Sequence, residues 1–242
     1  MTDAQDRIAG RTIIVTGASS GIGAATTGAL LERGAHVVAV ARSVGALASL
    51  GHSDEDGLVV ERADVRDREQ IEAVIDRTVA RFGGVDAIVC NAGVGEYASF
   101  LDMAPETIVE IVETNLLGTV WPIRAALPYM LSAGHGDVIV VSSVVAAMDS
   151  AGEAVYAATK AGQRSLAGCL DLEVKERGVR VSTILPGGVR TEFAMGRGRT
   201  PDMPDLDIML DPAEVAAAIL TLLAQPPHMR TTVWGFSHLA EE

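Results

Sequence analysis

Three polar residues in the second half of the chain have the types and the spacing to move a proton. Tyr156 and Lys160 are four residues apart in a helical pattern, which places both side chains on one helix face. A phenol with a pKa of about 10 shuttles protons poorly at neutral pH, and we expect the nearby ammonium group to lower that pKa. Ser143, with Ser142 as the neighbouring candidate, ends an apolar run and could donate a hydrogen bond to an oxygen that gains charge. Together these residues predict acid–base chemistry at the oxygen of a carbonyl or an alcohol.

A glycine-rich turn near the start of the chain has the composition of a diphosphate site. It runs from Thr16 to Gly23 in the order Thr-Gly-Ala-Ser-Ser-Gly-Ile-Gly. An apolar run precedes it and a helical pattern follows it. Glycines let the backbone approach phosphates closely, and the start of a helix offers free N–H groups. This position between a strand and a helix predicts dinucleotide binding, although an ordinary turn would also explain the glycines.

The end of the second apolar run indicates which dinucleotide is bound. A site for NAD(H) places an acidic residue there to bind the ribose 2′-hydroxyl. No acidic residue occurs between Val37 and Val44, and Arg42 stands there instead. A guanidinium can pair with a 2′-phosphate, whereas a carboxylate would repel it. We therefore predict NADP(H) as the cofactor. The alternative is a solvated surface arginine and a loose cofactor choice, with the phosphate contacted by Ser19 or Ser43.

Short apolar runs alternate with longer helical patterns along the whole chain. The runs expected as strands are 12–16, 37–41, 58–61, 87–90, 137–142 and 179–185, with 231–236 as a seventh at the sheet edge. The helical patterns are 21–33, 67–82, 105–131, 154–177 and 212–224. This alternation implies βαβ units, and runs that are apolar on both faces imply strands covered on both sides. We predict an α/β fold, a single-domain Rossmann-type doubly wound parallel sheet of six to seven strands with helices on both faces.

Between residues 190 and 210 the periodic pattern breaks. Glycines, prolines and aspartates separate a few apolar residues there. A long irregular stretch in a compact domain is usually functional or mobile. We interpret residues 190–210 as a substrate lid, called the lid segment below; a solvent loop without a role is the alternative. No internal repeat or linker occurs, so we expect one domain over residues 1–242.

The bulk composition excludes several classes of protein. The net charge of −13 over 242 residues argues against a nucleic-acid-binding surface. The five histidines are scattered, and the two cysteines, Cys90 and Cys169, lie in apolar or helical patterns. We therefore expect no metal site and two buried thiols. No signal peptide begins the chain, and no apolar run approaches the roughly 18 residues of a membrane span. A cytoplasmic protein without membrane or nucleic-acid partners is expected.

Six motifs, taken in order, resemble those of the short-chain dehydrogenase/reductase family along nearly the whole chain. They are Thr16-Gly17-Ala18-Ser19-Ser20-Gly21-Ile22-Gly23, Ala63-Asp64-Val65, Cys90-Asn91-Ala92-Gly93, Asn115 with Ser142-Ser143, Tyr156-Ala157-Ala158-Thr159-Lys160, and Pro186-Gly187-Gly188-Val189-Arg190-Thr191. One departure occurs at Cys90, where the family commonly has asparagine. The subgroup that this chain resembles is bacterial and prefers NADP.

The resemblance implies a role for each matching residue. The catalytic residues would be Asn115, Ser143, Tyr156 and Lys160, with Lys160 also holding the nicotinamide ribose and Asn115 supporting a water-linked proton path. The cofactor would contact the glycine turn at Gly17, Ser19, Ser20, Gly21, Ile22 and Gly23, and also Arg42, Asp64, Val65, Asn91, Ala92, Gly93, Tyr156, Lys160, Pro186, Gly187, Val189 and Thr191. Asp64 and Val65 would flank the adenine, the segment from Asn91 to Gly93 the adenosine ribose, and the segment from Pro186 to Thr191 the carboxamide.

The sequence does not identify the substrate. The residues expected around it are Val94, Tyr97, Val144, Val145, Met148, Glu153, Val155, Phe193 and Met195. Most are apolar, which favours a carbonyl or alcohol on a hydrophobic body. The similar subgroup acts on hydroxy acids, clavulanate-type aldehydes and assorted ketones. A 3-oxoacyl-carrier-protein-type reductase is an alternative, although the lid aspartates disfavour docking of an acidic carrier protein.

Two further function classes compete with a carbonyl reductase. A non-catalytic NADP-binding sensor would keep the fold, but such proteins often lose the tyrosine or the lysine. An isomerase or dehydratase would usually need a larger C-terminal substrate domain than the remaining residues allow. The family resemblance also implies a homotetramer, or a homodimer, packed through the helices expected at 105–131 and 154–177.

Overall fold

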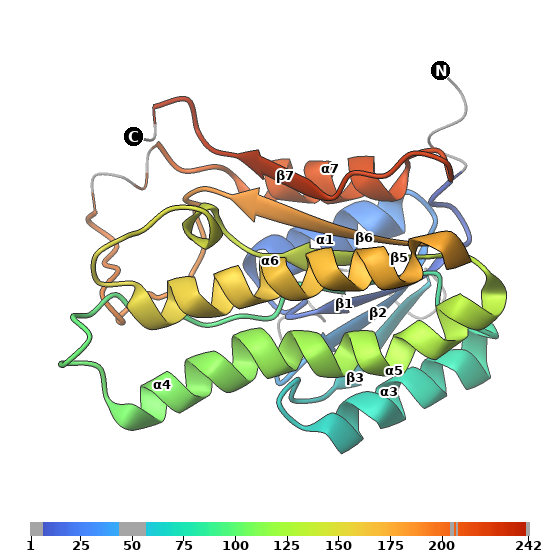
Figure 1. The fold of residues 1–242 in the computed structure, drawn as a ribbon, viewed down its shortest axis with the longest axis horizontal. Helices are drawn as coiled ribbons and strands as arrows, with labels where there is room; N and C mark the ends of the chain where they lie inside the picture. Colours follow the sequence, from blue (N-terminus) through green and yellow to red (C-terminus); the bar gives the residue numbers. More distant parts are fainter. Residues whose placement is uncertain (1–6, 44–56, 204–205, 207, 241–242) are drawn as a thin grey trace.

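A parallel sheet organises the protein, and the computed structural model describes residues 7–43, 57–203, 206 and 208–240 of it. In the described part the sheet has seven strands in the order β3-β2-β1-β4-β5-β6-β7 (Figure 1). Every pairing between neighbours is parallel. The strands are β1 Thr12–Thr16, β2 His36–Ala41, β3 Leu58–Arg62, β4 Ala87–Cys90, β5 Gly136–Val141, β6 Val179–Pro186 and β7 Val233–Phe236. The predicted fold class is confirmed, and the seventh apolar run forms the edge strand.

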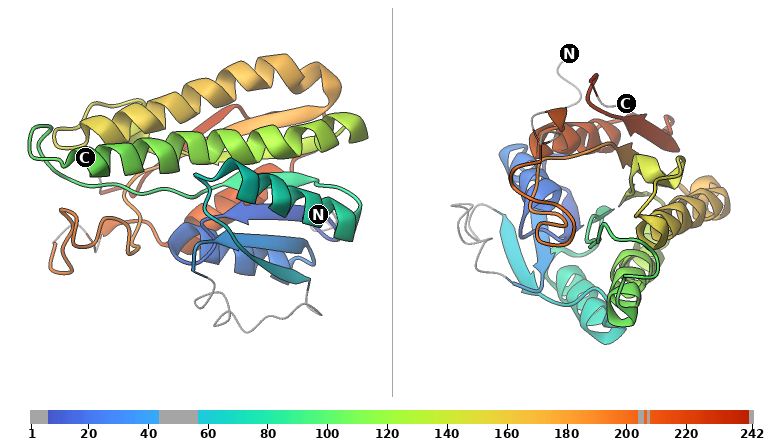
Figure 2. Two further views of the ribbon diagram at one scale, coloured as in Figure 1. Left: turned by 90° about the horizontal axis from the view of Figure 1, so that it is seen from below. Right: turned by 90° about the vertical axis from the view of Figure 1, so that its left-hand side faces the viewer.

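Helices cover both faces of the sheet (Figure 2). α1 (Gly21–Glu32) and α7 (Pro212–Leu223) lie on one face. The other face carries α3 (Arg68–Phe82), α5 (Gly118–Ala133) and α6 (Ala154–Val174). Alternate residues of a strand point to opposite faces, so every strand position in the middle of the sheet meets a helix layer. In β1, Ile13 packs into the cluster with α1 and α7, and Ile14 packs into the cluster on the other side.

Two of the helices begin at side chains that cap them. Asp67 accepts hydrogen bonds from the backbone N–H groups of Glu69 and Gln70 at 3.0 and 3.1 Å and starts α3. Asp211 starts α7 in a capping box with Glu214, and a proline follows in the first turn. The helix start predicted at Asp211 is therefore confirmed. These caps satisfy N–H groups that have no partner within their own helix.

The prediction of one continuous helix over residues 105–131 is wrong in its middle. α4 (Pro105–Val112) passes into a π-helical turn, η2 (Glu113–Leu117), before α5 begins. The carbonyl of Asn115 in that turn accepts from the side chains of Thr119 and Gln163, at 2.7 and 2.8 Å. The side chains of Thr119 and Gln163 thus both donate to this carbonyl. Wide turns of this kind occur frequently at functional sites.

The two cysteines differ in their surroundings. Cys90 at the end of β4 is buried, as predicted. Cys169 is exposed, and the prediction of a buried thiol is wrong there. The helical pattern of α6 does not itself distinguish its outer face, because alanine and glycine occur on every side of that helix.

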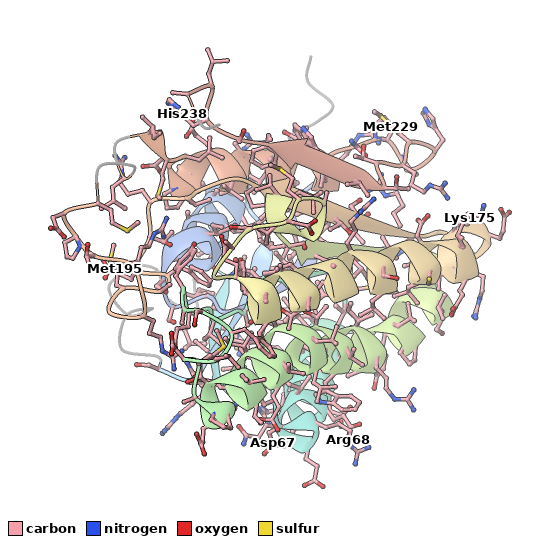
Figure 3. All side chains as sticks on the ribbon, turned by 60° about the vertical axis from the view of Figure 1, so that its left-hand side comes forward. Asp67, Arg68, Lys175, Met195, Met229 and His238 are labelled. Atoms are coloured by element: carbon pink, nitrogen blue, oxygen red, sulfur yellow. The ribbon has the colours of Figure 1, made fainter. Side chains whose placement is uncertain are left out.

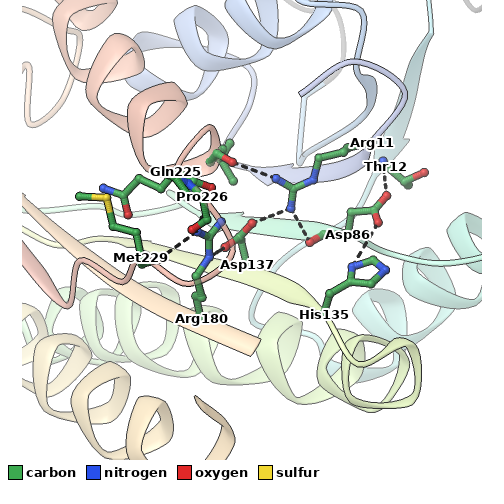
Figure 4. Close-up of polar contacts among 10 residues, drawn as sticks. Arg11, Thr12, Asp86, His135, Asp137, Arg180, Gln225, Pro226 and Met229 are labelled. Atoms are coloured by element: carbon green, nitrogen blue, oxygen red, sulfur yellow. Dashed lines mark hydrogen bonds and ion pairs between the residues drawn. The ribbon is translucent and has the colours of Figure 1, made fainter. Parts of the chain in front are cut away.

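A buried ion cluster joins the strands at the edge opposite to the lid segment (Figure 4). Asp137, 4% exposed, lies between the guanidinium groups of Arg11 and Arg180, each 2.6 Å from one carboxylate oxygen. Arg180 also donates to the carbonyls of Gln225, Pro226 and Met229 at 3.0 to 3.1 Å. One carboxylate therefore ties β5, β6 and the segment that precedes β7 to the start of β1.

We predict that Asp137→Asn lowers the free energy of unfolding by about 3–5 kcal/mol, because two largely buried arginines lose their shared carboxylate. Guanidinium denaturation measures the change. Glu72→Gln is the matched control: Glu72 pairs with Arg68 at 3.3 Å on the exposed side of α3, and we expect a change of at most about 0.5 kcal/mol. Equal effects of the two substitutions would contradict the proposed importance of the cluster.

Candidate active site

The motifs identified in the sequence meet at the carboxyl edge of the sheet. The glycine turn follows β1, Asn91 follows β4, Ser143 follows β5, and Gly187 follows β6. The strand order reverses between β1 and β4, and ligands of open parallel sheets bind outside the carboxyl ends at such a point. Figure 3 shows Met195 of the lid segment at this end and Met229 and Lys175 at the other.

α6 and the end of β5 hold the three acid–base residues together. Tyr156 and Lys160 lie one turn apart on α6, and the Lys160 Nζ atom lies 5.5 Å from the centroid of the Tyr156 ring. The same Nζ donates to the Val141 carbonyl at 3.0 Å. Ser142 Oγ donates to the Lys160 carbonyl at 2.9 Å, so this serine anchors the helix. Ser143 is the serine whose side chain interacts with the hydroxyl of Tyr156.

The electrostatics of this pair differ from the prediction. Burial raises the pKa of the Tyr156 phenol above its ordinary value, and the interaction with Ser143 and the charge of Arg199 oppose that rise. Burial also lowers the pKa of Lys160 to about 7. The pKa of Tyr156 is therefore raised, where the sequence analysis predicted that it would be lowered. The reason is that the same dry surroundings disfavour the charged form of both groups.

Asn115 occupies the π-helical turn and is completely buried. Its Oδ1 accepts from the Val94 N–H at 2.8 Å, and its Nδ2 donates to the Val94 carbonyl at 2.9 Å and to Thr159 Oγ1 at 3.0 Å. The amide thus pins the loop after β4 to α6, on the turn just before Lys160. This geometry makes Asn115 a positioning residue. Its place in a water-linked proton path stays a prediction.

The glycine turn has the close contacts expected of a diphosphate cradle. Gly17 and Gly21 have φ values of +66° and +51°, a left-handed conformation that favours glycine. A Cβ atom on Gly17 would lie 2.8 Å from Ala92 Cα, and one on Gly23 would collide with the Gly17 carbonyl. Ser20 precedes α1 but makes no side-chain cap, so the first N–H groups of that helix remain available to an anion. These residues fit the diphosphate of a dinucleotide.

Asn91 braces this turn from the neighbouring strand. Its Nδ2 donates to the carbonyls of Thr16 and Gly17, at 3.0 and 3.2 Å. Thr16 Oγ1 in return accepts from the N–H groups of Asn91 and Ala92, at 3.1 and 3.2 Å. The family resemblance assigns Asn91 to the adenosine ribose. The structure shows its amide engaged with the backbone of the glycine turn.

The residues predicted around the adenosine lie beyond β2 and β3. Arg42 follows β2 with a side chain that is 56% exposed, and it lies 4.0 Å from Glu110 of α4. No acidic residue occupies the described positions 37–43; Val44 lies outside the described residues. The carboxylate of Asp64 is held by Arg66 at 2.6 Å, and this contact lowers the pKa of Asp64. Val65 is buried against Gly118.

The segment predicted to hold the carboxamide joins β6 to the lid segment. Pro186 ends β6, and the Gly187 N–H donates to the Phe236 carbonyl at 2.9 Å. Val189 is buried and pairs with Leu210. A Cβ atom on Gly21 would lie 2.9 Å from the Thr191 side chain. The lid segment therefore starts in contact with the glycine turn.

The described part of the lid segment packs on the loop that follows β4. Pro204, Asp205 and Asp207 of the lid segment lie outside the described residues. The Tyr97 N–H donates to the Arg197 carbonyl at 2.9 Å, and Arg197 pairs with Glu110 at 2.6 Å. Gly198, with φ +93°, is so close to Tyr97 that a Cβ atom would collide with the tyrosine backbone. The Phe193 ring lies 5.4 Å from the Tyr156 ring.

Some of the residues expected around the substrate lie elsewhere. Val155 points into a small apolar cluster with Met103 and Ile111, because it is one position away from Tyr156 on α6. Met148 is 57% exposed, and Glu153 accepts a hydrogen bond from Ser150. The prediction for Val155 is therefore wrong.

The sequence analysis also missed two residues near Tyr156. A Cβ atom on Gly95 would lie 3.3 Å from the Tyr156 ring, so only glycine leaves that ring and Phe193 in place. Arg199 of the lid segment is 4% exposed. A glycine two positions beyond Asn91-Ala92-Gly93 was a signal for the first. No sequence signal separated Arg199 from the other arginines of the segment.

No three His, Cys, Asp or Glu side chains come together in the described ranges in a way that could hold a metal ion. None of the helices within those ranges has both the length and the apolar character that crossing a bilayer requires.

Comparison with known proteins places these observations in one family. The family model described as short chain dehydrogenase matches residues 11–202. A 3-oxoacyl-[acyl-carrier-protein] reductase of Vibrio cholerae is 37% identical over 90% of this chain and 91% of its own. An uncharacterized oxidoreductase of Staphylococcus haemolyticus is 35% identical over 91% of this chain and 94% of its own.

Solved structures agree with the sequence relatives. The closed form of serine dehydrogenase complexed with NADP⁺ has a TM-score of 0.88 at 29% identity and covers 96% of each chain. An alcohol dehydrogenase from the archaeon Thermococcus sibiricus, complexed with 5-hydroxy-NADP, has a TM-score of 0.86 at 30% identity, covering 96% of this chain and 98% of its own. The protein described here belongs to the short-chain dehydrogenase/reductase family of NAD(P)-dependent oxidoreductases.

Proposed function

We propose that this protein is an NADP(H)-dependent oxidoreductase that interconverts a carbonyl and a primary or secondary alcohol. The observation that carries the proposal is the grouping of Ser143, Tyr156 and Lys160 at the carboxyl edge of the sheet. The glycine turn after β1 lies at the same edge. This common edge supports a site at which proton transfer and dinucleotide binding occur together.

In this reaction the nicotinamide supplies or accepts the hydride at the substrate carbon. The protein handles the oxygen. Tyr156 is protonated at neutral pH, as a phenol ordinarily is, and could donate its proton to a carbonyl oxygen as that oxygen gains charge. Ser143 would hydrogen-bond the same oxygen while charge builds on it. Lys160, with a pKa of about 7, can be protonated there, and its ammonium form would help Tyr156 to give up the proton.

Several observations support NADP(H) over NAD(H). Arg42 stands at the end of β2, where an acidic residue would repel a 2′-phosphate. Its half-exposed side chain is free to move from Glu110, 4.0 Å away, to a more strongly charged phosphate. The serine dehydrogenase and the archaeal alcohol dehydrogenase named above were both solved with NADP or an NADP analogue.

A 3-oxoacyl-carrier-protein-type reductase is the second candidate, and the relative from Vibrio cholerae favours it. Against it stands the net charge of −13, because an acidic carrier protein would be repelled unless a local basic patch received it. A non-catalytic NADP-binding sensor is the third candidate. It would not need the grouping of Ser143, Tyr156 and Lys160 that the chain retains.

We further propose a homotetramer packed through α4, α5 and α6, with a homodimer as the alternative. A groove of about 280 Å³ between α4 and α6 is lined almost wholly by apolar atoms, including those of Phe100, Val112 and Leu116. Phe100 and Val109 are 62% and 52% exposed beside it. Large exposed apolar residues on neighbouring helices are typical of an interface between subunits.

We predict that Tyr156→Phe lowers turnover of NADPH with a reducible carbonyl by about 100- to 10,000-fold, because the proton donor is removed. NADPH binding, followed by fluorescence titration, should remain. Tyr129→Phe is the control, since that hydroxyl only contacts Asp76 at the surface, at 3.3 Å. Retained turnover in Tyr156→Phe would refute the assignment of the proton donor.

We predict that Arg42→Asp weakens NADPH binding by about 10- to 100-fold and improves NADH relative to it, because a charge-assisted hydrogen bond is replaced by repulsion. The ratio of the two dissociation constants is the measurement. Arg33→Asp, an exposed arginine at the end of α1, should leave the ratio unchanged. An unchanged ratio in Arg42→Asp would mean that Ser19 or Ser43 reads the phosphate.

The native mass in solution tests the assembly. We predict four times the 25.2 kDa of one chain, measured by light scattering after size exclusion. Val112→Asp, which places a charge in the α4–α6 groove, should shift the mass to smaller species because the charge would be buried without a partner. A monomeric wild-type protein would rule out the tetramer and the dimer alike.

A further inference from the structure

Arg199 is a buried arginine for which the described residues provide no carboxylate partner. Its exposure is 4%, and it is the one arginine among the described residues that is buried. Nη1 donates to the Phe193 carbonyl at 3.3 Å, and Nη2 contacts the thioether of Met209. No acidic side chain of the described residues lies within 4.0 Å of it. A thioether is a weak acceptor, so the Phe193 carbonyl is the one strong acceptor that the described residues provide for this side chain.

The other two arginines of the lid segment are paired. Arg190 lies 3.3 Å from Asp211, and Arg197 lies 2.6 Å from Glu110. Both side chains are at least one-third exposed. The buried member of the set is therefore the one without a counter-charge. Burial of an unpaired charge is costly, and proteins normally compensate it with an opposite charge.

The backbone of the lid segment is bent so that this side chain turns inward. Ala194 has a φ of +58° and is the only described residue other than glycine with a positive φ. Its carbonyl accepts from the N–H groups of Arg197 and Arg199, at 2.9 and 3.1 Å. Strained backbone of this kind clusters at ligand-binding sites. The tight turn brings Arg199 back under Phe193.

The turn also brings Arg199 close to the reacting groups. Phe193, whose carbonyl Arg199 holds, has its ring 5.4 Å from that of Tyr156. The charge of Arg199 acts on the Tyr156 hydroxyl in the direction that opposes the effect of burial. Phe193 therefore connects Arg199 to the ring of Tyr156.

We propose that Arg199 binds a carboxylate of the substrate, so that the enzyme acts on short oxo acids and the corresponding hydroxy acids. This inference rests on the proposed carbonyl–alcohol function. A planar carboxylate matches the paired N–H groups of a guanidinium and would supply the missing counter-charge. The carboxylate is unchanged in the reaction: an oxo acid, NADPH and one proton give a hydroxy acid and NADP⁺. In it the C=O carbon gains the hydride and the oxygen gains the proton from Tyr156.

The alternative is that Arg199 only braces the lid segment. A brace would affect all substrates alike, whereas a carboxylate site affects only those with a carboxylate. A third case is a substrate presented as a thioester by a carrier protein, which has no free carboxylate for Arg199 to bind. The charge state of the substrate therefore separates the three cases.

The experiment compares kcat/KM for NADPH-dependent reduction of 2-, 3- and 4-oxo acids of four or five carbons, each against its methyl ester and its N-acetylcysteamine thioester. For the best acid we expect Arg199→Met to lower kcat/KM by about 10- to 100-fold and to leave the ester within about twofold. Arg199→Lys should restore part of the loss, because it keeps the charge but not the planar fork. Arg197→Met, in the same segment but paired with Glu110 and one-third exposed, is the control and should change neither substrate.

Parallel losses for acid and ester in Arg199→Met would overturn the proposal in favour of a brace. Preference of the wild-type protein for the thioester or ester would also overturn it. Absence of any turnover would instead refute the proposed function. In that case calorimetric titration of each oxo acid into the protein with NADP⁺ tests the carboxylate site separately. Binding that Arg199→Met abolishes and Arg197→Met keeps would support the carboxylate site, and binding that is equal in both, or absent, would refute it.

Discussion

The junction between α6 and the end of β5 is the constraint on which the candidate site depends. Ser142 Oγ donates to the carbonyl of Lys160, and Lys160 Nζ donates to the carbonyl of Val141. These two bonds join one turn of the helix to the last residues of the strand. They set the height and the rotation of α6 against the sheet. Tyr156, one turn earlier, is thereby held opposite Ser143.

Burial at this junction affects the protonation of the side chains as well as their packing. It favours the neutral forms of both Tyr156 and Lys160. A phenol that stays protonated suits reduction, and a lysine with a pKa of about 7 can take up or release a proton under small changes in its surroundings. Arg199 is then the permanent cation nearest to the reacting groups among the described lid arginines. An acidic protein with a net charge of −13 thus keeps basic groups inside its site.

Two sets of buried polar contacts stabilise opposite edges of the sheet. Asp137 with Arg11 and Arg180 holds the strands at their amino ends (Figure 4). At the carboxyl ends the hydrogen bonds of Asn91 and Asn115 hold the glycine turn and the loop after β4. A rigid scaffold with adaptable loops at one edge is the usual arrangement in open parallel sheets. In this chain the π-helical turn carries Asn115, whose side-chain amide bonds the loop after β4 while its backbone carbonyl accepts from Thr119 and Gln163.

The sequence by itself determined the order of the elements, the parallel sheet and the motifs at its carboxyl edge. Periodicity and glycine positions are local properties, and each strand end carries its motif directly after it. Tertiary structure alone decided the rest. It divided the helix predicted at 105–131 by a π turn, exposed Cys169, turned Val155 away from the site, and kept the Tyr156 pKa high. It also buried Arg199 rather than Arg190 or Arg197. These outcomes depend on which atoms surround a side chain from distant segments, and burial and desolvation cannot be read from neighbours along the chain.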